Sequence, residues 1–406
     1  LSGTQISTDA LAELSMFPNL TDVDLSDNGY GPAFDFAKLP EQITGIDLTG
    51  NEIYDYDNLV SVVVEENGDE TVTKPARNYQ TLPSNRNQAK KNIRRLVRFY
   101  RQNKEAITAG TIDMKMTDVD GNLQTYTTLR DVPDANLLTY LQTNFADLFN
   151  GDQIDLSKHL GLDQKTKELL VAPADNVTNF EGIQFLVENP YWEGAKISLY
   201  SAGEESIASM PNIKVGKFIT QVILQNIEVE DIDLSNATDL RSAWVQNNPA
   251  LQKLDLSYST IWGQGDKETE GNGTYGSSLM VLGCPILKEI KLPEKNELKA
   301  YRIDIECLDA LETFDMSNVK MVAELSIGDL NKDFNLVYPE LTIFYSEDGY
   351  AGTYFACSEN TFYRESTQAF LKANYTDIDP DDTVRRLGYT SSLSYDKTKD
   401  AVGGLY

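Results

Sequence analysis

Apolar residues recur along the chain in the pattern L-x-x-L-x-L-x-x-N. One unit consists of Leu20, Val23, Leu25 and Asn28. A second unit consists of Ile43, Ile46, Leu48 and Asn51. A short strand with this spacing points its leucines into a shared interior, and the asparagine that follows can hydrogen-bond the turning backbone. Because each unit is too small to bury its own apolar face, the pattern predicts that neighbouring units stack.

The pattern returns in the second half of the chain as two interleaved series. The first series comprises Val229, Ile232 and Leu234; Leu251, Leu254 and Leu256; Leu287, Ile290 and Leu292; and Leu311, Phe314 and Met316. The second comprises Leu240, Ala243 and Val245; Leu298, Tyr301 and Ile303; and Val322, Leu325 and Ile327. Two strand-like segments in each repeat predict strands on both sides of a solenoid, rather than a helix on its convex side.

The stretch from Cys284 to Pro293 reads C-x-x-L-x-x-I-x-L-P. It resembles the repeat unit of BspA-like proteins, an irregular bacterial type of the leucine-rich-repeat family. Cys307 again precedes a repeat start, so the repeat position predicts that Cys284 and Cys307 are stacked, buried thiols. Cys357 lies outside this register. The three cysteines have neither the number of a disulfide framework nor the spacing of a zinc site.

A second resemblance covers the segments Val132–Phe145 and Val177–Leu186. They are similar to the helical cap and the first repeat of surface lipoproteins of gut Bacteroidetes. The resemblance implies a helical cap, a location at the cell surface or outside the cell, and a lipid anchor that this chain does not contain. In that family a calcium-loop-like turn follows the cap. Here Phe149, Gly151 and Lys158 occupy positions that need oxygen ligands, so we predict no metal ion and no other cofactor.

Residues 61–129 interrupt the repeats. Valines on either side of a polar turn predict a hairpin over 62–72, and the acidic segment 118–122 predicts a second hairpin turn. Residues 86–107 have the apolar spacing of a helix. The opposite face of that helix carries a basic stripe: Lys90, Lys91, Arg94, Arg95, Arg98, Arg101 and Lys104. The stripe predicts a solvated face or one docked on acidic repeats; contact with a membrane or an anionic polymer is the alternative.

The overall charge excludes one class of partner. The 406 residues include 35 Lys and Arg against 63 Asp and Glu, a formal net charge of -28. A chain without excess cations cannot release counterions from a phosphate backbone, so we predict no nucleic-acid binding. No apolar run reaches the roughly 18–20 residues of a membrane span. Leu1 falls on a repeat leucine, so we expect that a targeting segment and further repeats precede this chain.

Acidic residues occupy the strand positions between the leucines, which face the concave binding side in repeats of this type. We take Asp231, Asp233 and Asp255 as candidate binding residues because a stripe of aspartates would attract a basic partner. The alternative is that such aspartates are ordinary solvated residues of the ladder. The same positions also hold Asp22, Asp24, Asp47, Asp315, Lys253 and Lys291.

A glycine-rich insertion over residues 260–278 carries two further candidates, Trp262 and Tyr275. Loops that project from a rigid scaffold often make contacts, and aromatic side chains supply contact area at modest entropic cost. The alternative is a disordered excursion. Trp244, Tyr258 and Tyr301 lie on nearby predicted strands and could extend an aromatic patch, although core packing could take some of them.

Catalytic motifs are absent from the sequence, and we predict that the protein is not an enzyme. There is no P-loop, H-E-x-x-H or G-x-S-x-G pattern. The single histidine, His159, lies within the predicted cap. A carbohydrate-active enzyme with paired carboxylates remains an alternative, but nothing in the sequence singles out a pair.

The sequence therefore predicts a β-rich α+β protein: an irregular leucine-rich-repeat solenoid with a helical cap and an inserted hairpin and helix. Residues 1–60 would end a first array, 61–129 would be the insert or linker, 130–345 the cap and second array, and 346–406 a C-terminal cap or tail. We expect non-catalytic binding of a protein or glycan by a secreted, surface-anchored bacterial protein, with an adhesion-type role. The alternatives are a structural stalk or a carbohydrate-active enzyme.

Overall fold

The chain is strand-rich and divides into two compact units. The computed structural model describes residues 1–31, 34–48, 50–51, 62–64, 70–72, 78–79, 90–112, 114–117, 122–203, 206–264, 276–331, 334–342, 346–347, 350–351, 353–358, 361, 364–375, 394–396 and 401–403. The first unit comprises residues 1–165 and 181–192, and the second comprises 166–180 and 193–406.

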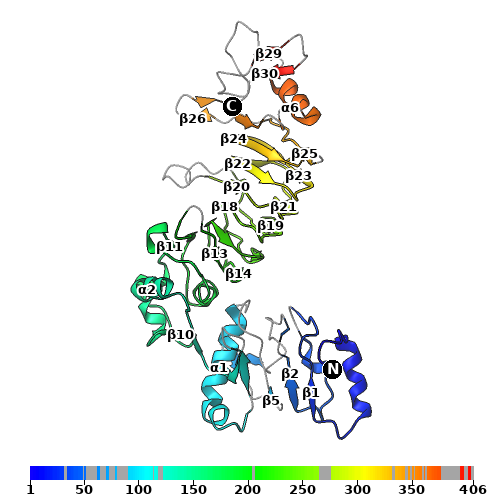
Figure 1. Cartoon of the computed structure of the whole chain (residues 1–406), viewed down its shortest axis with the longest axis vertical. Coiled ribbons are helices and arrows are strands. Elements are labelled where there is room, and N and C mark those ends of the chain that lie inside the picture. The colour runs from blue at the N-terminus through cyan, green and yellow to red at the C-terminus, as the bar shows by residue number, and fades with distance from the viewer. Residues whose placement is uncertain are drawn as a thin grey trace. The chain divides into compact units, whose positions relative to one another are not determined.

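The first unit combines short strands with most of the helices. Its strands are β1 (Asp22–Asp24), β2 (Gly45–Asp47), β3 (Val62–Val64), β4 (Glu70–Val72), β5 (Asn78–Tyr79), β6 (Lys115–Thr117), β7 (Leu123–Thr125), β8 (Leu129–Arg130), β9 (Phe149–Asn150) and β10 (Gln153–Asp155). Its helices are η1 (Thr8–Met16), η2 (Phe36–Lys38), α1 (Lys90–Thr108), α2 (Ala135–Asn144), η3 (Ala146–Leu148), α3 (Leu162–Lys165) and α4 (Gln184–Val187) (Figure 1).

The leucine pattern at the start of the chain forms stacked parallel strands, as predicted. β1 pairs in parallel with β2, and β2 pairs in parallel with β5. Leu25, Ile46 and Leu48 are completely buried in one apolar cluster. The two predicted asparagines are buried at the ends of these strands: the Asn51 amide donates to the carbonyls of Leu25 (2.9 Å) and Leu48 (3.0 Å). They satisfy the backbone where the chain turns.

The described parts of residues 61–129 contain the predicted strand pairs and helix. β3 and β4 form an antiparallel hairpin, and so do β6 and β7. The acidic turn at residues 118–121 lies outside the described residues. The predicted helix is α1. Its residues Val97, Phe99 and Ile107 are buried.

The predicted cap contains a helix, α2, that begins as its sequence indicates. Asp134 precedes the helix, and its Oδ1 accepts hydrogen bonds from the backbone N–H groups of Asn136 (2.9 Å) and Leu137 (3.0 Å). A carboxylate at this position satisfies two of the N–H groups that the first turn leaves free. Leu137 and Leu141, one turn apart, then point into the interior.

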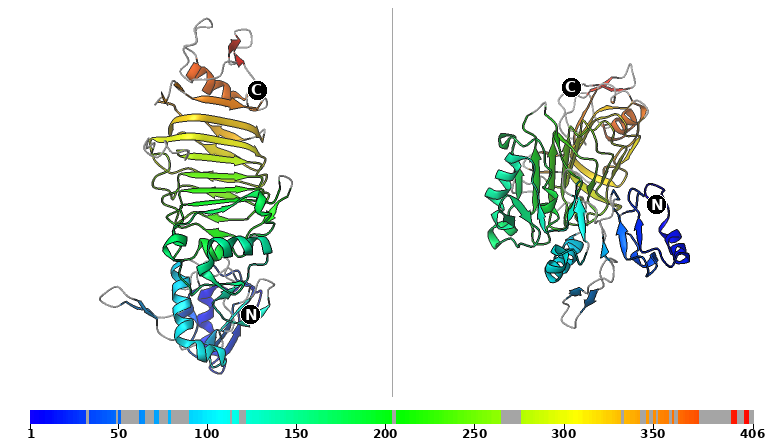
Figure 2. Two further views of the ribbon diagram at one scale, coloured as in Figure 1. Left: turned by 90° about the vertical axis from the view of Figure 1, so that its left-hand side faces the viewer. Right: turned by 60° about the horizontal axis from the view of Figure 1, so that its bottom comes forward.

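The second unit is built around one eight-stranded parallel sheet. The strands follow one another in chain order (Figure 2): β11 (Leu169–Val171), β12 (Lys196–Tyr200), β15 (Gln221–Gln225), β18 (Ser242–Gln246), β20 (Ser278–Leu282), β22 (Leu298–Leu308), β24 (Val319–Leu330) and β28 (Tyr354–Cys357). This is the long sheet. Every neighbouring pair is parallel, so each connection returns the chain to the same end of the sheet.

Short strands alternate with those of the long sheet. They are β13 (Ala208–Ser209), β14 (Ile213–Lys214), β16 (Ile227–Glu228), β17 (Ile232–Asp233), β19 (Lys253–Asp255), β21 (Glu289–Lys291), β23 (Thr313–Asp315) and β25 (Asn335–Val337). They form the parallel pairs β13–β16, β14–β17, β19–β21 and β23–β25. Both interleaved series of the sequence are therefore strands, which confirms the prediction of two strands in each repeat.

Alternating side chains explain why these segments are strands. In β18 the side chains of Ala243 and Val245 are at most 1% exposed, whereas Trp244 between them is partly exposed. A parallel strand with one buried face needs this period of two. Tyr301 departs from the repeat pattern, since Ala300 and Ile303 are buried while Tyr301 is partly exposed. The register between β22 and β24 shifts beside this point, after Leu298.

Residues in the left-handed region occur at the ends of four successive strands of the long sheet. Asn226, Asn247 and Gly283 directly follow β15, β18 and β20, and Cys307 is the next-to-last residue of β22; their φ lies between 52° and 65°. The amide of Asn247 donates to Oδ1 of Asn226 at 2.7 Å, and glycine fits the next position because a Cβ there would lie 2.5 Å from Oδ1 of Asn247. Cys307 is exposed at the end of β22, so the prediction of a buried thiol is wrong for Cys307; it is correct for Cys284.

The remaining described elements of the second unit lie near its two ends. η4 (Pro173–Asp175) follows β11, and the others follow β25: β26 (Ser346–Glu347), β27 (Tyr350–Ala351), α6 (Glu365–Tyr375), β29 (Ser394–Asp396) and β30 (Ala401–Gly403). Cys357, which has no place in the repeat pattern, pairs with Ile327 in the last strand of the long sheet.

Candidate binding surface

The candidate residues lie partly on the short strands and partly on the long sheet of the second unit. Asp233 and Asp255 lie on short strands, with Asp231 just before β17 and Tyr258 just after β19. Trp244 and Tyr301 belong to the long sheet. We call β14, β17, β19, β21, β23 and β25 the short-strand ladder. The predicted aspartates and the predicted aromatic patch therefore form two separate candidate surfaces.

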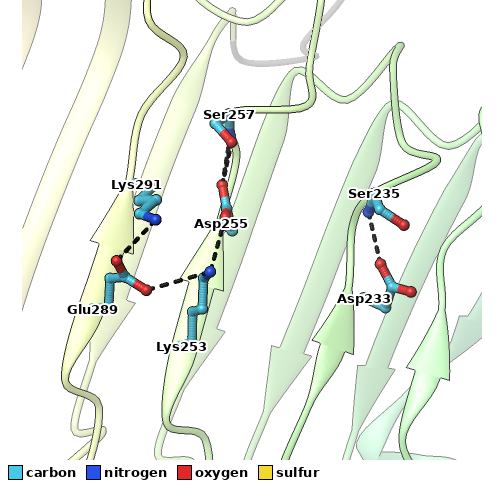
Figure 3. Close-up of polar contacts among 7 residues, drawn as sticks. All are labelled: Asp233, Ser235, Lys253, Asp255, Ser257, Glu289 and Lys291. Atoms are coloured by element: carbon cyan, nitrogen blue, oxygen red, sulfur yellow. Dashed lines mark hydrogen bonds and ion pairs between the residues drawn. The ribbon is translucent and has the colours of Figure 1, made fainter. Parts of the chain in front are cut away.

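Aspartates close the short strands by accepting hydrogen bonds from the backbone two residues ahead. Oδ1 of Asp233 accepts from the N–H of Ser235 at 2.8 Å, and Oδ1 of Asp255 accepts from the N–H of Ser257 at 3.0 Å (Figure 3). Asp24, Asp155 and Asp315 make the same contact with Ser26, Ser157 and Ser317. This is the local turn that aspartate favours. The Asp-x-Ser repeats therefore have a structural role at the strand ends.

Lysines pair with the acidic side chains across the short-strand ladder. Nζ of Lys214 lies 2.7 Å from Oδ2 of Asp233. Nζ of Lys253 lies 3.1 Å from Asp255 and 3.3 Å from Glu289, and Lys291 lies 3.0 Å from Glu289 (Figure 3). The described ladder thus carries a network of opposite charges rather than a bare acidic stripe.

The titration of these carboxylates follows from their contacts. Partial burial raises the pKa of Asp255, but hydrogen bonds from Ser257 and Lys253 outweigh it, and the pKa lies below its ordinary value. The pKa of Asp233 is lowered in the same way, by Lys214 and Ser235. Asp231 is different, since desolvation and then the negative charge of Asp233 raise its pKa. Asp233 and Asp255 already have partners, so they offer little to a basic ligand.

The long sheet presents a second surface, which we call the long-sheet face. Its residues alternate with the buried core residues of four adjacent strands: Gln221, Ile223 and Gln225; Ser242, Trp244 and Gln246; Ser278, Met280 and Leu282; and Arg302, Asp304 and Glu306. Ile223, Trp244, Met280 and Asp304 lie in register in one row. Ile223, Trp244 and Met280 are only partly buried, so this row begins as an apolar strip.

The strip ends at a buried charge pair on β22. Nη2 of Arg302 lies 2.8 Å from Oδ2 of Asp304, whose side chain is 6% exposed. Nη1 of Arg302 lies 3.5 Å from Glu324 on β24, and the Tyr301 hydroxyl donates to the same carboxylate at 3.3 Å. A carboxylate this deeply buried is stabilised by the guanidinium beside it.

Three buried polar atoms of this face have no hydrogen-bond partner. They are the indole Nε1 of Trp244, Nε of Arg302 and Oδ1 of Asp304. An unpaired buried donor or acceptor costs roughly 1–3 kcal/mol, and such atoms are rare enough in folded proteins to need an explanation.

The two aromatic candidates of the insertion give no further surface. Trp262 is completely buried and its Nε1 donates to the carbonyl of Ser278 at 3.4 Å, so the indole belongs to the core rather than to an exposed patch. Tyr275 lies outside the described residues. Tyr258 is 49% exposed and stands beside the short-strand ladder.

Sequence reasoning missed Met280, Arg302 and Asp304. The signal was present in the segment from Arg302 to Glu306, where charged residues alternate with isoleucine, the period expected of a strand with one buried face. The leucine-rich pattern drew attention to the other strand series instead.

The structure also describes part of the basic stripe on α1. Arg98, Arg101 and Lys104 of the basic stripe are exposed, and Arg101 donates to the carbonyl of Ser157. No group of three or more His, Cys, Asp and Glu side chains is arranged to hold a metal ion in the described part of the chain.

None of the described helices has the length and apolar character needed to cross a membrane.

Comparison with known proteins adds no relative: no protein-family model, no curated protein and no solved structure matches the chain.

Proposed function

We propose that this protein is a non-catalytic binding protein whose partner contacts the long-sheet face. The observation that carries the proposal is the row of Ile223, Trp244 and Met280, partly exposed apolar side chains held in register on paired parallel strands. Exposed apolar side chains that adjoin one another on a rigid scaffold are typical of interaction sites. The indole N–H without a partner adds an unused donor at the centre of the row.

The proposal includes a leucine-rich-repeat solenoid as the architecture of the second unit. Its support is the chain-order parallel sheet, the second series of short strands, and the left-handed backbone conformation that recurs at the strand ends, at Asn226, Asn247, Gly283 and Cys307. In such an array each repeat contacts its neighbours, and the surface residues of successive repeats form an extended binding face. Location at the bacterial cell surface belongs to the same proposal and rests on the sequence resemblance.

A binding panel with a matched pair of variants tests this function. The purified chain is applied to immobilised extracellular-matrix proteins and to immobilised oligosaccharides. Ile223→Arg places a charge in the middle of the apolar row, and Tyr258→Arg places the same charge beside the short-strand ladder. We expect the chain to bind at least one member of the panel, with a loss of about tenfold or more in Ile223→Arg alone.

Two results contradict the proposal. Retention on no member of the panel favours the structural stalk, because a spacer needs no ligand. If wild type and Ile223→Arg bind equally well, the binding site is not on the long-sheet face. Cleavage of a bound oligosaccharide would instead support the carbohydrate-active enzyme.

A further inference from the structure

The unpaired polar atoms of the long-sheet face restrict what its ligand can be. Nε of Arg302 is a donor and Oδ1 of Asp304 is an acceptor; both are buried, and both belong to one ion pair on β22. A ligand that bonds both atoms must accept a hydrogen bond from Nε of Arg302 and donate one to Oδ1 of Asp304, within a short distance. A hydroxyl group does both, whereas a carboxylate only accepts and an ammonium group only donates.

The charge around this pair argues against ionic ligands. Glu306 flanks it on β22 and Glu324 faces it from β24, so an anion meets more carboxylates than guanidinium groups. A cation could pair with Asp304, but it would leave Nε of Arg302 without an acceptor and would approach a guanidinium group. A neutral ligand with neighbouring hydroxyl groups avoids the charge repulsion and leaves neither Nε of Arg302 nor Oδ1 of Asp304 unpaired.

The rest of the row fits the apolar side of the same ligand. Trp244 lies in register with Met280, and Met280 lies in register with Asp304. The indole is therefore two strand spacings, about 10 Å, from the charge pair. Sugar rings combine a C–H surface, which packs on aromatic faces, with hydroxyl groups at the edge.

From these observations we propose that the long-sheet face binds a neutral oligosaccharide. One ring packs on the indole of Trp244 and on Met280. Neighbouring hydroxyl groups of another ring accept a hydrogen bond from Nε of Arg302 and donate one to Oδ1 of Asp304. The side chain of Arg302 is 34% exposed and that of Asp304 is 6% exposed. Binding in this way therefore requires Arg302 to rotate and open Asp304 to the ligand. This inference rests on the proposed function and specifies the partner as a glycan rather than a protein.

The test is an array of neutral glucan, mannan and galactan oligosaccharides beside uronic-acid and amino-sugar oligosaccharides. We expect wild type to bind neutral members. Asp304→Asn removes a charge-assisted hydrogen bond and should weaken binding about tenfold or more. Trp244→Ala should cost about tenfold through lost stacking, whereas Trp244→Phe keeps a ring and should lose less. Tyr258→Ala, beside the other ladder, should bind as wild type does.

A fluorescence titration supplies a second readout. Binding should change the emission of Trp244, and the change should disappear in Trp244→Phe while binding remains. Because Asp304 is buried, thermal unfolding of Asp304→Asn is measured first. If that variant does not fold, Trp244→Ala decides the test, since its indole is partly exposed.

The outcomes separate this inference from the proposed function. It is overturned if no neutral oligosaccharide binds, if only charged sugars bind, or if Trp244→Ala and Asp304→Asn bind unchanged. If a matrix protein binds instead and Ile223→Arg abolishes that binding, the glycan is wrong and the binding function stands. Absence of any ligand overturns both.

Discussion

Oδ1 of Asn51 accepts a hydrogen bond from the backbone N–H of Asn28 at 3.0 Å, so the asparagines of two successive repeats are linked directly. The same oxygen accepts from the N–H of Tyr30 at 3.1 Å. The Asn51 amide donates to two carbonyls, one in each of the two repeats. One buried side chain thus joins the backbones of neighbouring units.

Replacement of this asparagine should destabilise the stacked strands at the start of the chain. Asn51→Ala removes all four hydrogen bonds and leaves buried backbone groups unpaired, a cost of about 3 kcal/mol. Hydrogen exchange at the amides of β1 and β2 measures the effect locally. Asn150→Ala, which truncates an exposed side chain of the same unit, serves as the control. Unchanged protection in Asn51→Ala would show that the asparagines do not hold the repeats together.

Deletion of one repeat tests the solenoid architecture. Gln221 of β15 pairs with Ser242 of β18, so removal of residues 221–241 brings β18 into the place of β15. In a repeat array the shortened chain should still unfold cooperatively, with reduced stability. Removal of residues 221–231 brings a short strand into that place and should abolish folding. Circular dichroism during thermal unfolding distinguishes the two deletions. Equal behaviour of both argues against the repeat architecture.

The short-strand ladder should lose stability in acid. The pKa values of Asp233 and Asp255 lie below their ordinary value in the folded chain. A carboxylate with a lowered folded pKa contributes stability above its unfolded pKa of about 3.9, and this contribution is lost as the pH falls through the folded pKa. Melting temperatures between pH 7 and pH 3 should therefore drop less steeply in Asp233→Asn and Asp255→Asn than in wild type.

Asp231 provides a control of opposite sign for this pH dependence. Its pKa is raised by desolvation and by Asp233, so its charge opposes folding at neutral pH. Asp231→Asn should raise the melting temperature at pH 7, and the gain should shrink as the pH falls. A gain that is constant with pH would contradict the electrostatic cause.

Gly283 should not tolerate a side chain. Its φ is +65°, and an added Cβ would lie 2.5 Å from Oδ1 of Asn247, a residue whose Nδ2 donates a hydrogen bond to Asn226. Gly283→Ala therefore combines backbone strain with a disturbed asparagine contact, at a cost of about 1–3 kcal/mol. At Gly203 a Cβ meets nothing within 4 Å, so Gly203→Ala should change stability by less than about 0.5 kcal/mol. Denaturant unfolding compares the two.

The three thiols should react in a defined order. Cys307 is exposed, whereas Cys284 is completely buried and its burial raises its pKa to about 11. Burial raises the pKa of Cys357 to about 12. Because the thiolate is the reactive form, iodoacetamide at pH 8 should label Cys307 first. Peptide mass spectrometry follows each site, and Cys307→Ser should lose the fast phase. Early labelling of Cys284 would contradict the described burial.

Several elements could be predicted because their cause is local in the sequence. The leucine spacing acts on backbone within a few residues, and so does the hydrogen bond from the amide of Asn51 to the carbonyl of Leu48. The hairpins β3–β4 and β6–β7 and the helix α1 follow equally local patterns. The domain boundaries at residues 60, 129 and 345 stay predictions.

The candidate sites were harder to predict because exposure depends on distant segments. Trp262 and Trp244 are both indoles in the second repeat block, yet the first is in the core and the second is partly exposed. From the sequence alone, the aspartates of the Asp-Leu-Ser segments suggest an acidic stripe that is open to a basic partner. In the structure both Asp233 and Asp255 accept hydrogen bonds from serine N–H groups. Asp233 also pairs with Lys214 on the neighbouring strand, and Asp255 pairs with Lys253 on its own strand.

The sequence by itself determined that this chain consists of stacked short strands, because apolar residues at this spacing have no other way to leave water. Only the tertiary structure decided that the second strand series forms the extended sheet and that Trp244, Arg302 and Asp304 share its face. Cys307 makes the same point, since its repeat position suggested burial, whereas in the structure it has a left-handed backbone conformation and is exposed. Register between strands far apart in the chain sets these neighbours, and a one-dimensional pattern does not contain that register.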